Sequence, residues 1–277
     1  MKAFIIDVGQ CNGCFGCQFA CKDEHVGNDW APIAKPQPDS GQFWMRLDEH
    51  IRGAVPHVRM HYVPHLCMHC DEAPCIASCP IEGALYKRDD GLVIIDTDAC
   101  TGCKACVDTC PYGSIYFNDG LNLAQKCTGC AHLIDSDDWD VPRCVDSCPT
   151  DALRFGEESE LAELIAQAEV MKPDLGTKPR VYYLNVPKRF IAGTVYDPLE
   201  KEVVIGAVCT LTPLGADLGD ERAIVTDAFG DFWLKDLEEG TYSLAIAADG
   251  FATRVYDSID TERDVNLGDV ALSRRTG

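Results

Sequence analysis

The stretch Cys11-Asn-Gly-Cys14-Phe-Gly-Cys17-Gln-Phe-Ala-Cys21 decides the fold, because it spaces four thiols by two, two and three intervening residues. Three cysteines with two-residue gaps can wrap around one metal group in a tight turn that glycine permits. The fourth cysteine, three residues further on, points away from that group. We therefore expect Cys21 to serve a different site from Cys11, Cys14 and Cys17.

Related groups of cysteines fill the first half of the chain. Sixteen of the 17 cysteines lie between residues 11 and 148, and three of the four groups end in Cys-Pro. Four sets of four thiolates satisfy four [4Fe-4S] clusters held wholly by cysteine, and such clusters move single electrons. The later groups are Cys67, Cys70, Cys75 and Cys79; Cys100, Cys103, Cys106 and Cys110; and Cys127, Cys130, Cys144 and Cys148.

Disulfides and zinc are the alternatives to iron and sulfide. A disulfide scaffold is typical of short secreted chains, whereas this chain has 277 residues and tight C-x-x-C groups. Zinc ligands normally come as two separated C-x-x-C pairs, but three of these groups run four cysteines together. Iron-sulfur clusters are therefore favoured. No Ser/His/Asp arrangement, phosphate loop or nucleotide fingerprint is found, so the sequence indicates electron transfer without bond-making chemistry.

The ferredoxin arrangement also suggests how the cysteines are shared. In a two-cluster ferredoxin the first three cysteines of one group are completed by the last cysteine of its mate. If two such modules are nested, groups one and four are mates, as are groups two and three. The expected sets are Cys11, Cys14, Cys17 with Cys148; Cys127, Cys130, Cys144 with Cys21; Cys67, Cys70, Cys75 with Cys110; and Cys100, Cys103, Cys106 with Cys79.

A few other side chains invite a functional interpretation. His69 lies between two ligands, where a nearby tuning or solvent-facing histidine is a better expectation than an iron ligand. Lys104 and Lys126 adjoin ligands, and a raised local potential is weighted equally with an ordinary surface lysine. Cys209 stands in an alternating apolar run and is expected to be a buried small hydrophobe.

The length and the 46% hydrophobic content support at least two cores. We expect a four-cluster domain over 1–155, a helix and linker over 156–189, and a β-sandwich over 190–277. Within the first, a strand over 3–8, an irregular span over 22–66, a hairpin at 83–96 and a helical turn beginning at each last cysteine are expected. The irregular span is interpreted equally as a docking surface or a packed insertion.

Apolar periodicity organises the rest of the chain. Leu161, Leu164, Ile165 and Ala168 predict a helix over 159–171. Short alternating runs then predict strands at 191–196, 202–212, 223–226, 231–234, 242–247, 253–256 and 265–272. The fold class is therefore α+β, a doubled, pseudo-symmetric bacterial ferredoxin-like domain plus a small all-β sandwich.

The net charge of -21 argues against nucleic acid as a partner. An acidic face could dock a basic partner, although a merely solvated surface is the more ordinary interpretation. A charged residue follows only a few apolar ones at the start, and no apolar run is long enough to span a bilayer. We expect no leader and no membrane span, hence a cytoplasmic chain or one exported together with a partner.

The four groups, in this order and spacing, resemble the iron-sulfur subunit of the molybdopterin oxidoreductases of the dimethyl sulfoxide reductase family, over residues 1–155. That resemblance implies the nested pairing given above. It also implies a non-catalytic subunit that docks on a large catalytic subunit carrying a molybdenum or tungsten bis-pterin cofactor.

A narrower resemblance rests on residues 64–70, 125–133 and 172–183 and on the appended β domain. These are similar to the small subunits of pyrogallol-phloroglucinol transhydroxylase and related catechol dehydroxylases, and the tail resembles carboxypeptidase-regulatory-like or transthyretin-like sandwiches. The transhydroxylase subunit lacks cysteines at one cluster site, whereas all sixteen stand here. An intact wire suits electrons taken from an external donor, so a reductive dehydroxylase is preferred over a non-redox transhydroxylase or a free polyferredoxin.

Overall fold

The computed structural model describes residues 1–136 and 139–275, which form two compact units. The first unit comprises Met1–His50 and His61–Val186, and the second comprises Ile51–Met60 and Pro187–Gly277. Each unit has a hydrophobic core of its own. Among the described residues, no helix is both long enough and apolar enough to cross a bilayer.

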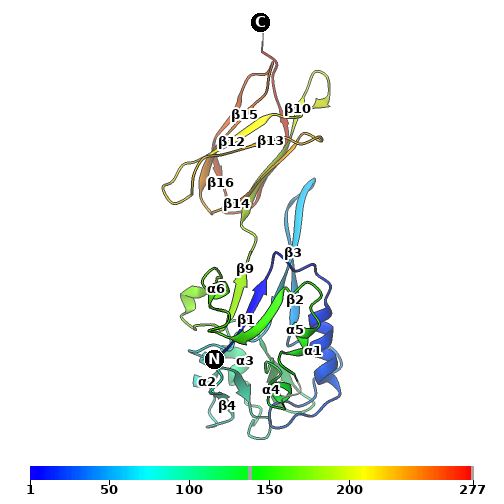
Figure 1. Cartoon of the computed structure of the whole chain (residues 1–277), viewed down its shortest axis with the longest axis vertical. Helices are drawn as coiled ribbons and strands as arrows, with labels where there is room; N and C mark the ends of the chain where they lie inside the picture. Colours follow the sequence, from blue (N-terminus) through cyan, green and yellow to red (C-terminus); the bar gives the residue numbers. More distant parts are fainter. Residues whose placement is uncertain (137–138, 276–277) are drawn as a thin grey trace. The chain divides into compact units, whose positions relative to one another are not determined.

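The first unit is built on a three-stranded sheet in the order β8-β1-β9 (Figure 1). β1 (Lys2–Asp7) runs antiparallel to β8 (Leu153–Glu157) and parallel to β9 (Val181–Leu184). Every residue of β1 after Lys2 is buried, as a strand between two neighbours with both faces covered requires. The strand expected over 3–8 is thereby confirmed.

Two small hairpins complete the cysteine-rich part of the first unit. β4 (Leu85–Lys87) pairs with β5 (Val93–Ile95), which confirms the expected hairpin. β6 (Ile115–Asn118) pairs with β7 (Leu123–Lys126) and was not expected from the sequence. Each hairpin follows one cysteine group along the chain and connects that group to the next.

In each group a short helix begins one residue before the third cysteine. The expectation that a helical turn begins at each last cysteine is wrong, because the turn lies before that cysteine. A proline follows the last cysteine in three groups and disfavours helical geometry there. Lys22 follows Cys21 instead, so the first helix continues. The helices are α1 (Gly16–Val26), α2 (Pro74–Ala77), α3 (Ala105–Thr109) and α5 (Arg143–Asp146); α4 (Ala131–Ile134) follows Cys130.

The irregular span expected over 22–66 is wrong for its second half. β2 (Arg46–Ala54) and β3 (His57–His65) pair as a two-stranded hairpin that turns at Val55-Pro56. The prolines concealed it, although Val58, Met60 and Tyr62 alternate with polar residues as a strand requires. Trp44 is 2% exposed, so that part of the span is a packed insertion.

The helix expected over 159–171 is also wrong, since only α6 (Ala162–Ile165) forms there. One helical turn is marginal without tertiary support, and none of the four residues is buried. Further along, the backbone of Glu169 exchanges two hydrogen bonds with Tyr183, of 2.9 and 2.8 Å. Pairing with β9 therefore replaces helix, and a 3-10 turn (η1, Pro173–Leu175) follows.

The second unit is a sandwich of two four-stranded sheets. In one, β10 is antiparallel to β11 and β14 and parallel to β17; in the other the order is β13-β12-β15-β16. The strand expected over 202–212 is two strands in different sheets, because Gly206 turns the chain with a φ of +75°. Cys209 is fully buried in this core, as expected. The bounds are β10 (Arg189–Asp197), β11 (Glu202–Val203), β12 (Val208–Pro213), β13 (Arg222–Val225), β14 (Asp231–Leu237), β15 (Thr241–Ala247), β16 (Arg254–Asp260) and β17 (Val265–Ala271).

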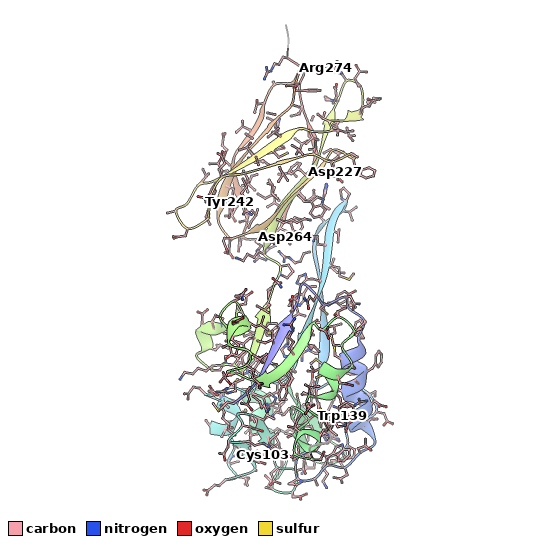
Figure 2. All side chains as sticks on the ribbon, viewed as in Figure 1. Cys103, Trp139, Asp227, Tyr242, Asp264 and Arg274 are labelled. Carbon is pink, nitrogen blue, oxygen red and sulfur yellow. The ribbon has the colours of Figure 1, made fainter. Side chains whose placement is uncertain are left out.

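The hairpin tip, residues 51–60, belongs to the second unit. Arg52 forms a bidentate ion pair with Asp264, at 2.7 and 2.6 Å, and the two side chains are 15% and 6% exposed (Asp264 is labelled in Figure 2). The Asn266 side chain donates to the carbonyl of Ala54 at 2.8 Å, and its oxygen lies 2.9 Å from Nδ1 of the buried His57. These contacts make the tip part of the sandwich.

Replacing Arg52 by alanine is expected to destabilise the second unit by about 3 kcal/mol, because Asp264 would be left buried without its cation. Amide hydrogen exchange in β10 and β17 should quicken about 100-fold, since 1.4 kcal/mol is tenfold, while iron content stays unchanged. Arg263, exposed beside Asp264, offers the matched control, and Arg263→Ala should leave the exchange rates alone. Equal exchange rates in Arg52→Ala and Arg263→Ala would contradict the view that the hairpin tip stabilises the second unit.

Candidate metal centres

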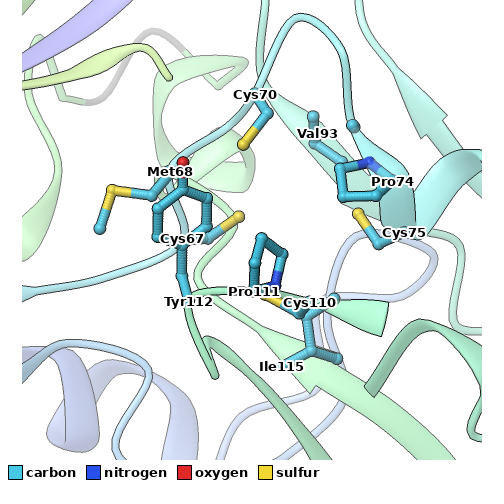
Figure 3. A pocket seen from close by; sticks show the side chains of 11 residues that line it. Cys67, Met68, Cys70, Pro74, Cys75, Val93, Cys110, Pro111, Tyr112 and Ile115 are labelled. Carbon is cyan, nitrogen blue, oxygen red and sulfur yellow. The ribbon is translucent and has the colours of Figure 1, made fainter. Parts of the chain in front are cut away.

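Cys67, Cys70, Cys75 and Cys110 line one cavity, here called site 3, of about 320 Å³, a volume that includes space open to solvent, as do the volumes of the next two cavities. Figure 3 shows the sulfur atoms of Cys67, Cys70 and Cys75 directed into the same space. The loop before α2 supplies the first two thiols, α2 supplies Cys75, and Cys110 caps α3. Pro74, Ile115 and other apolar side chains form the wall, so this is an apolar cavity with four soft ligands.

Cys79, Cys100, Cys103 and Cys106 line a second cavity, site 4, of about 340 Å³. Cys79 follows α2 and Cys106 lies on α3. Each of these two helices therefore has one cysteine in site 3 and one in site 4. Cys103 is exposed (Figure 2). Site 4 therefore reaches the protein surface.

Cys11, Cys14, Cys17 and Cys148 line the third cavity, site 1, of about 290 Å³. Gly13, between the first two thiols, has a φ of +72°, and a Cβ there would lie 2.3 Å from the Tyr62 ring. Only glycine fits this turn. Cys14 is exposed, so site 1 also reaches the surface.

Cys21, Cys127, Cys130 and Cys144 form site 2 and are all buried. The electrostatic neighbours of Cys144 begin with Cys130, Cys127 and Cys21, and those of Cys21 begin with Cys127 and Cys130. The cysteines of sites 1, 3 and 4 thus line cavities in sets of four, and those of site 2 are buried and interact electrostatically with one another.

Without a metal, burial keeps several of these thiols protonated. Burial raises the pKa of Cys17, Cys75 and Cys130 to about 12. A metal ligand must be a thiolate, and binding to iron compensates that cost. Cys148 is the exception: burial raises its pKa, but the N–H groups of Thr150 and Leu153, among others, outweigh this and lower it.

The donor set also fits a cluster better than one ion. In the part of the chain that the structure describes, no three His, Cys, Asp or Glu side chains converge closely enough for a single metal ion. Around a zinc ion the sulfurs would lie about 2.3 Å from the metal. Four thiols spread around an apolar cavity instead suit the larger [4Fe-4S] group, whose ligands are cysteine thiolates.

The sites follow one another in a fixed order. Cys17 of site 1 is an electrostatic neighbour of both Cys21 and Cys144 of site 2. The charge of Cys67 in site 3 raises the pKa of Cys127 in site 2, after burial as the main cause. α2 and α3 connect site 3 to site 4. The order is 1, 2, 3, 4, with exposed thiols only at the two ends among these sixteen cysteines.

Residues 177–180, here called the strap, close over site 3 and were missed by sequence reasoning. Asp71 and Glu72 donate main-chain hydrogen bonds to the carbonyls of Lys178 and Thr177 at 2.9 and 3.0 Å, and Arg180 donates to Met68 at 2.9 Å. The Thr177 hydroxyl lies 2.5 Å from that of Tyr112. Burial raises the pKa of Cys70 to about 11, and the hydrogen bond from Thr177 opposes part of that rise. The sequence contains the motif at 172–183, but it does not reveal that this segment bonds to the loop that carries Cys67 and Cys70.

The tuning residues named from the sequence have different surroundings. His69 is 1% exposed, so a solvent-facing histidine is wrong. The Val93 N–H donates to its Nδ1 at 2.9 Å, and burial, with the charges of Lys126 and Lys87, holds its pKa well below the usual value. His69 is therefore a neutral, packed side chain. Lys104 is exposed, whereas Lys126 is 2% exposed.

Known families match both units. A model of the 4Fe-4S dicluster domain matches residues 58–158, and one of the carboxypeptidase regulatory-like domain matches residues 191–273. One of the subunits of the tetrathionate reductase of Salmonella typhimurium is 33% identical over 199 residues, which cover 68% of this chain and 74% of that protein. With the cysteine sites, these matches show that the chain belongs to the iron-sulfur electron-transfer subunits of the molybdopterin oxidoreductases of the dimethyl sulfoxide reductase family.

Within that family one relative matches both domains. The small subunit of pyrogallol hydroxytransferase of Pelobacter acidigallici is 37% identical over 277 residues, covering 97% of this chain and 98% of that subunit. The iron-sulfur subunit of the arsenate respiratory reductase of a Shewanella species is 42% identical, but over 41% of this chain and 44% of that protein. The chain is thus similar to the hydroxytransferase small subunit along nearly its whole length.

Proposed function

We propose that this chain carries four [4Fe-4S] clusters as a single electron path to or from a large molybdopterin catalytic subunit. The observation that carries the proposal is that three cavities are each lined by four cysteines, while the other four cysteines are all buried. When bound, the clusters supply one-electron transfer. The protein's own part is to hold each cluster by four thiolates and to keep water from the inner two.

The ligand partition proposed is that of sites 1 to 4. Three cavities, each lined by four cysteines and by apolar side chains, support it for sites 1, 3 and 4. For site 2 the support is the mutual electrostatic proximity of four buried thiols. Because each set takes three cysteines from one group and one from another, we infer two nested ferredoxin-like modules, one holding sites 1 and 2 and the other sites 3 and 4.

The order of the sites supports a path with two exposed ends. An electron entering at the exposed Cys103 side of site 4 would pass sites 3 and 2 and leave at the Cys14 side of site 1, or travel the reverse way. One end then suits the catalytic subunit and the other an external donor. Most thiols of the inner sites are buried, and burial strengthens electrostatic effects there.

For the reaction of the complex we propose reductive dehydroxylation of a phenolic, catechol-type substrate. Removal of one hydroxyl takes two electrons and two protons: the carbon–oxygen bond breaks, a carbon–hydrogen bond forms, and water leaves. Electrons must come from outside, so a complete set of sixteen thiols has a use. The chemistry itself belongs to the partner subunit, which would carry the molybdenum or tungsten cofactor.

A second candidate is a hydroxyl-transfer reaction without net redox change. The similarity to the pyrogallol hydroxytransferase small subunit along nearly the whole chain favours it. The two candidates differ in whether turnover consumes electrons, which makes them separable. A free polyferredoxin, the third alternative, predicts isolation of this chain alone.

The test is anaerobic purification of the native protein. We expect a much larger subunit to accompany this chain, about sixteen iron atoms per copy, and loss of one hydroxyl from a catechol only when a low-potential reductant is present. Hydroxyl transfer between two phenols at the same rate without reductant would overturn the dehydroxylase in favour of the second candidate. An isolated chain with full iron content would overturn both.

A further inference from the structure

Lys126 is a buried cation without a carboxylate. Its side chain is 2% exposed, and Nζ donates to the carbonyl oxygen of Val93 and, at 3.0 Å, to that of Cys127. No Asp or Glu within residues 1–136 and 139–275 forms an ion pair with it. Burying an ammonium costs desolvation free energy unless an opposite charge compensates it. We therefore expect a negative group near Lys126.

The negative groups at hand are the thiolates of the two inner sites. Cys127, whose carbonyl accepts from Lys126, belongs to site 2, and Val93, the other acceptor, lines the cavity of site 3. Burial raises the pKa of Cys75 in site 3 and of Cys127 in site 2, and the Lys126 charge acts in the opposite direction on both. Because its two acceptors are main-chain carbonyls of Val93, beside site 3, and of Cys127, in site 2, the ammonium lies between these two sites.

Two other lysines near cluster ligands, Lys104 and Lys87, pair with carboxylates, whereas the partly buried Lys22, next to Cys21, donates to the carbonyls of Pro38 and Gln42 at 2.6 and 2.8 Å. Lys104, next to Cys103 of site 4, is 52% exposed in its side chain, pairs with Asp119 at 3.4 Å and lies over the Phe117 ring. Lys87 donates to the carboxylate of Asp71 and is partly exposed. For both Lys104 and Lys126 the sequence left a raised local potential and an ordinary surface lysine equally weighted, and the structure separates the two lysines by burial and by pairing.

Resting on the proposed four-cluster function, we propose that Lys126 raises the reduction potentials of the two inner clusters, those of sites 2 and 3, and of these two alone. Each added electron makes a cluster and its four thiolates more negative, so a fixed cation beside them favours the reduced form. Salt screens a buried charge much less than a surface charge. Lys126 thus acts on the reduction potentials in the middle of the path and does not touch substrate.

The experiment is an EPR-monitored redox titration of the purified native complex and of three variants. Lys126→Met keeps the length of the side chain and removes its charge, Lys126→Arg keeps the charge, and Lys104→Met is the matched control at an exposed, paired lysine. In Lys126→Met we expect the reduction equilibrium constants of two of the four clusters to fall by at least tenfold. For one electron, this lowers the midpoint potential by about 59 mV. Lys126→Arg should stay nearer the wild type, and Lys104→Met should leave these two potentials unchanged.

The outcomes separate this inference from the function it rests on. Fewer than four clusters in the wild type would overturn the proposed function itself. Four clusters with unchanged potentials in Lys126→Met, or with all four potentials shifted alike, would overturn the role of Lys126 only. If Lys126→Met loses iron, the Lys126→Arg variant decides the question. Reduction equilibrium constants within twofold of the wild type, at full iron content, would support a role for the Lys126 charge. Larger changes at sites 2 and 3 would contradict it. The shift in Lys126→Met should also persist at high salt.

Discussion

Replacing Cys21 by alanine is expected to remove the cluster of site 2 and to leave that of site 1 in place. Cys21 stands in the same sequence group as Cys11, Cys14 and Cys17, but it lies on α1 one helical turn after Cys17 and faces Cys127 and Cys130. Iron should fall by about four atoms per chain.

The identity of the lost cluster can be read from paired variants. Cys144→Ala should abolish the same EPR signal as Cys21→Ala, whereas Cys148→Ala should abolish a different one, that of site 1. Cys209→Ala, which removes a buried thiol of the second unit, is the control that should keep all the iron. If Cys21→Ala and Cys148→Ala silence the same signal, the proposed partition is wrong.

The four cysteine groups could be recognised from the sequence because the geometry within each group is local. A helical turn bridges cysteines with a three-residue gap, and glycine such as Gly13 permits the turn with two-residue gaps. Both are properties of neighbouring residues. The alternating strands of the second unit were recognisable for the same reason, since a period of two is written directly in the side chains.

The features that were missed depend on contacts distant in sequence. Nothing near Arg52 announces Asp264, which lies 212 residues later, and so the hairpin tip could not be assigned to the second unit. The strap pairs residues 177–180 with residues that follow Cys67, and the helix expected at 159–171 gives way to pairing with Tyr183. In each case tertiary hydrogen bonds overrode a local pattern that was correctly observed.

Site 3 should depend on the strap more than on any other segment that binds no metal. Arg180 is 4% exposed, donates to both carboxylate oxygens of Asp71 at 2.6 and 2.9 Å, and lies 2.9 Å from Glu158. Asp71 directly follows the ligand Cys70. The guanidinium therefore fixes the position of the loop that carries two thiols, Cys67 and Cys70.

Arg180→Ala is expected to cost about 3 kcal/mol or more, because it breaks a largely buried pair at two carboxylates, and to make the cluster of site 3 labile. Incubation with an iron chelator should remove about four iron atoms per chain from the variant before any from the wild type. Lys178→Ala is the matched control in the same strap: its pair with Glu72 is exposed on both sides, at 67% and 64%, and exposed pairs contribute little. Equal iron release from both variants would mean that the strap holds the loop through its main-chain hydrogen bonds, without the help of Arg180.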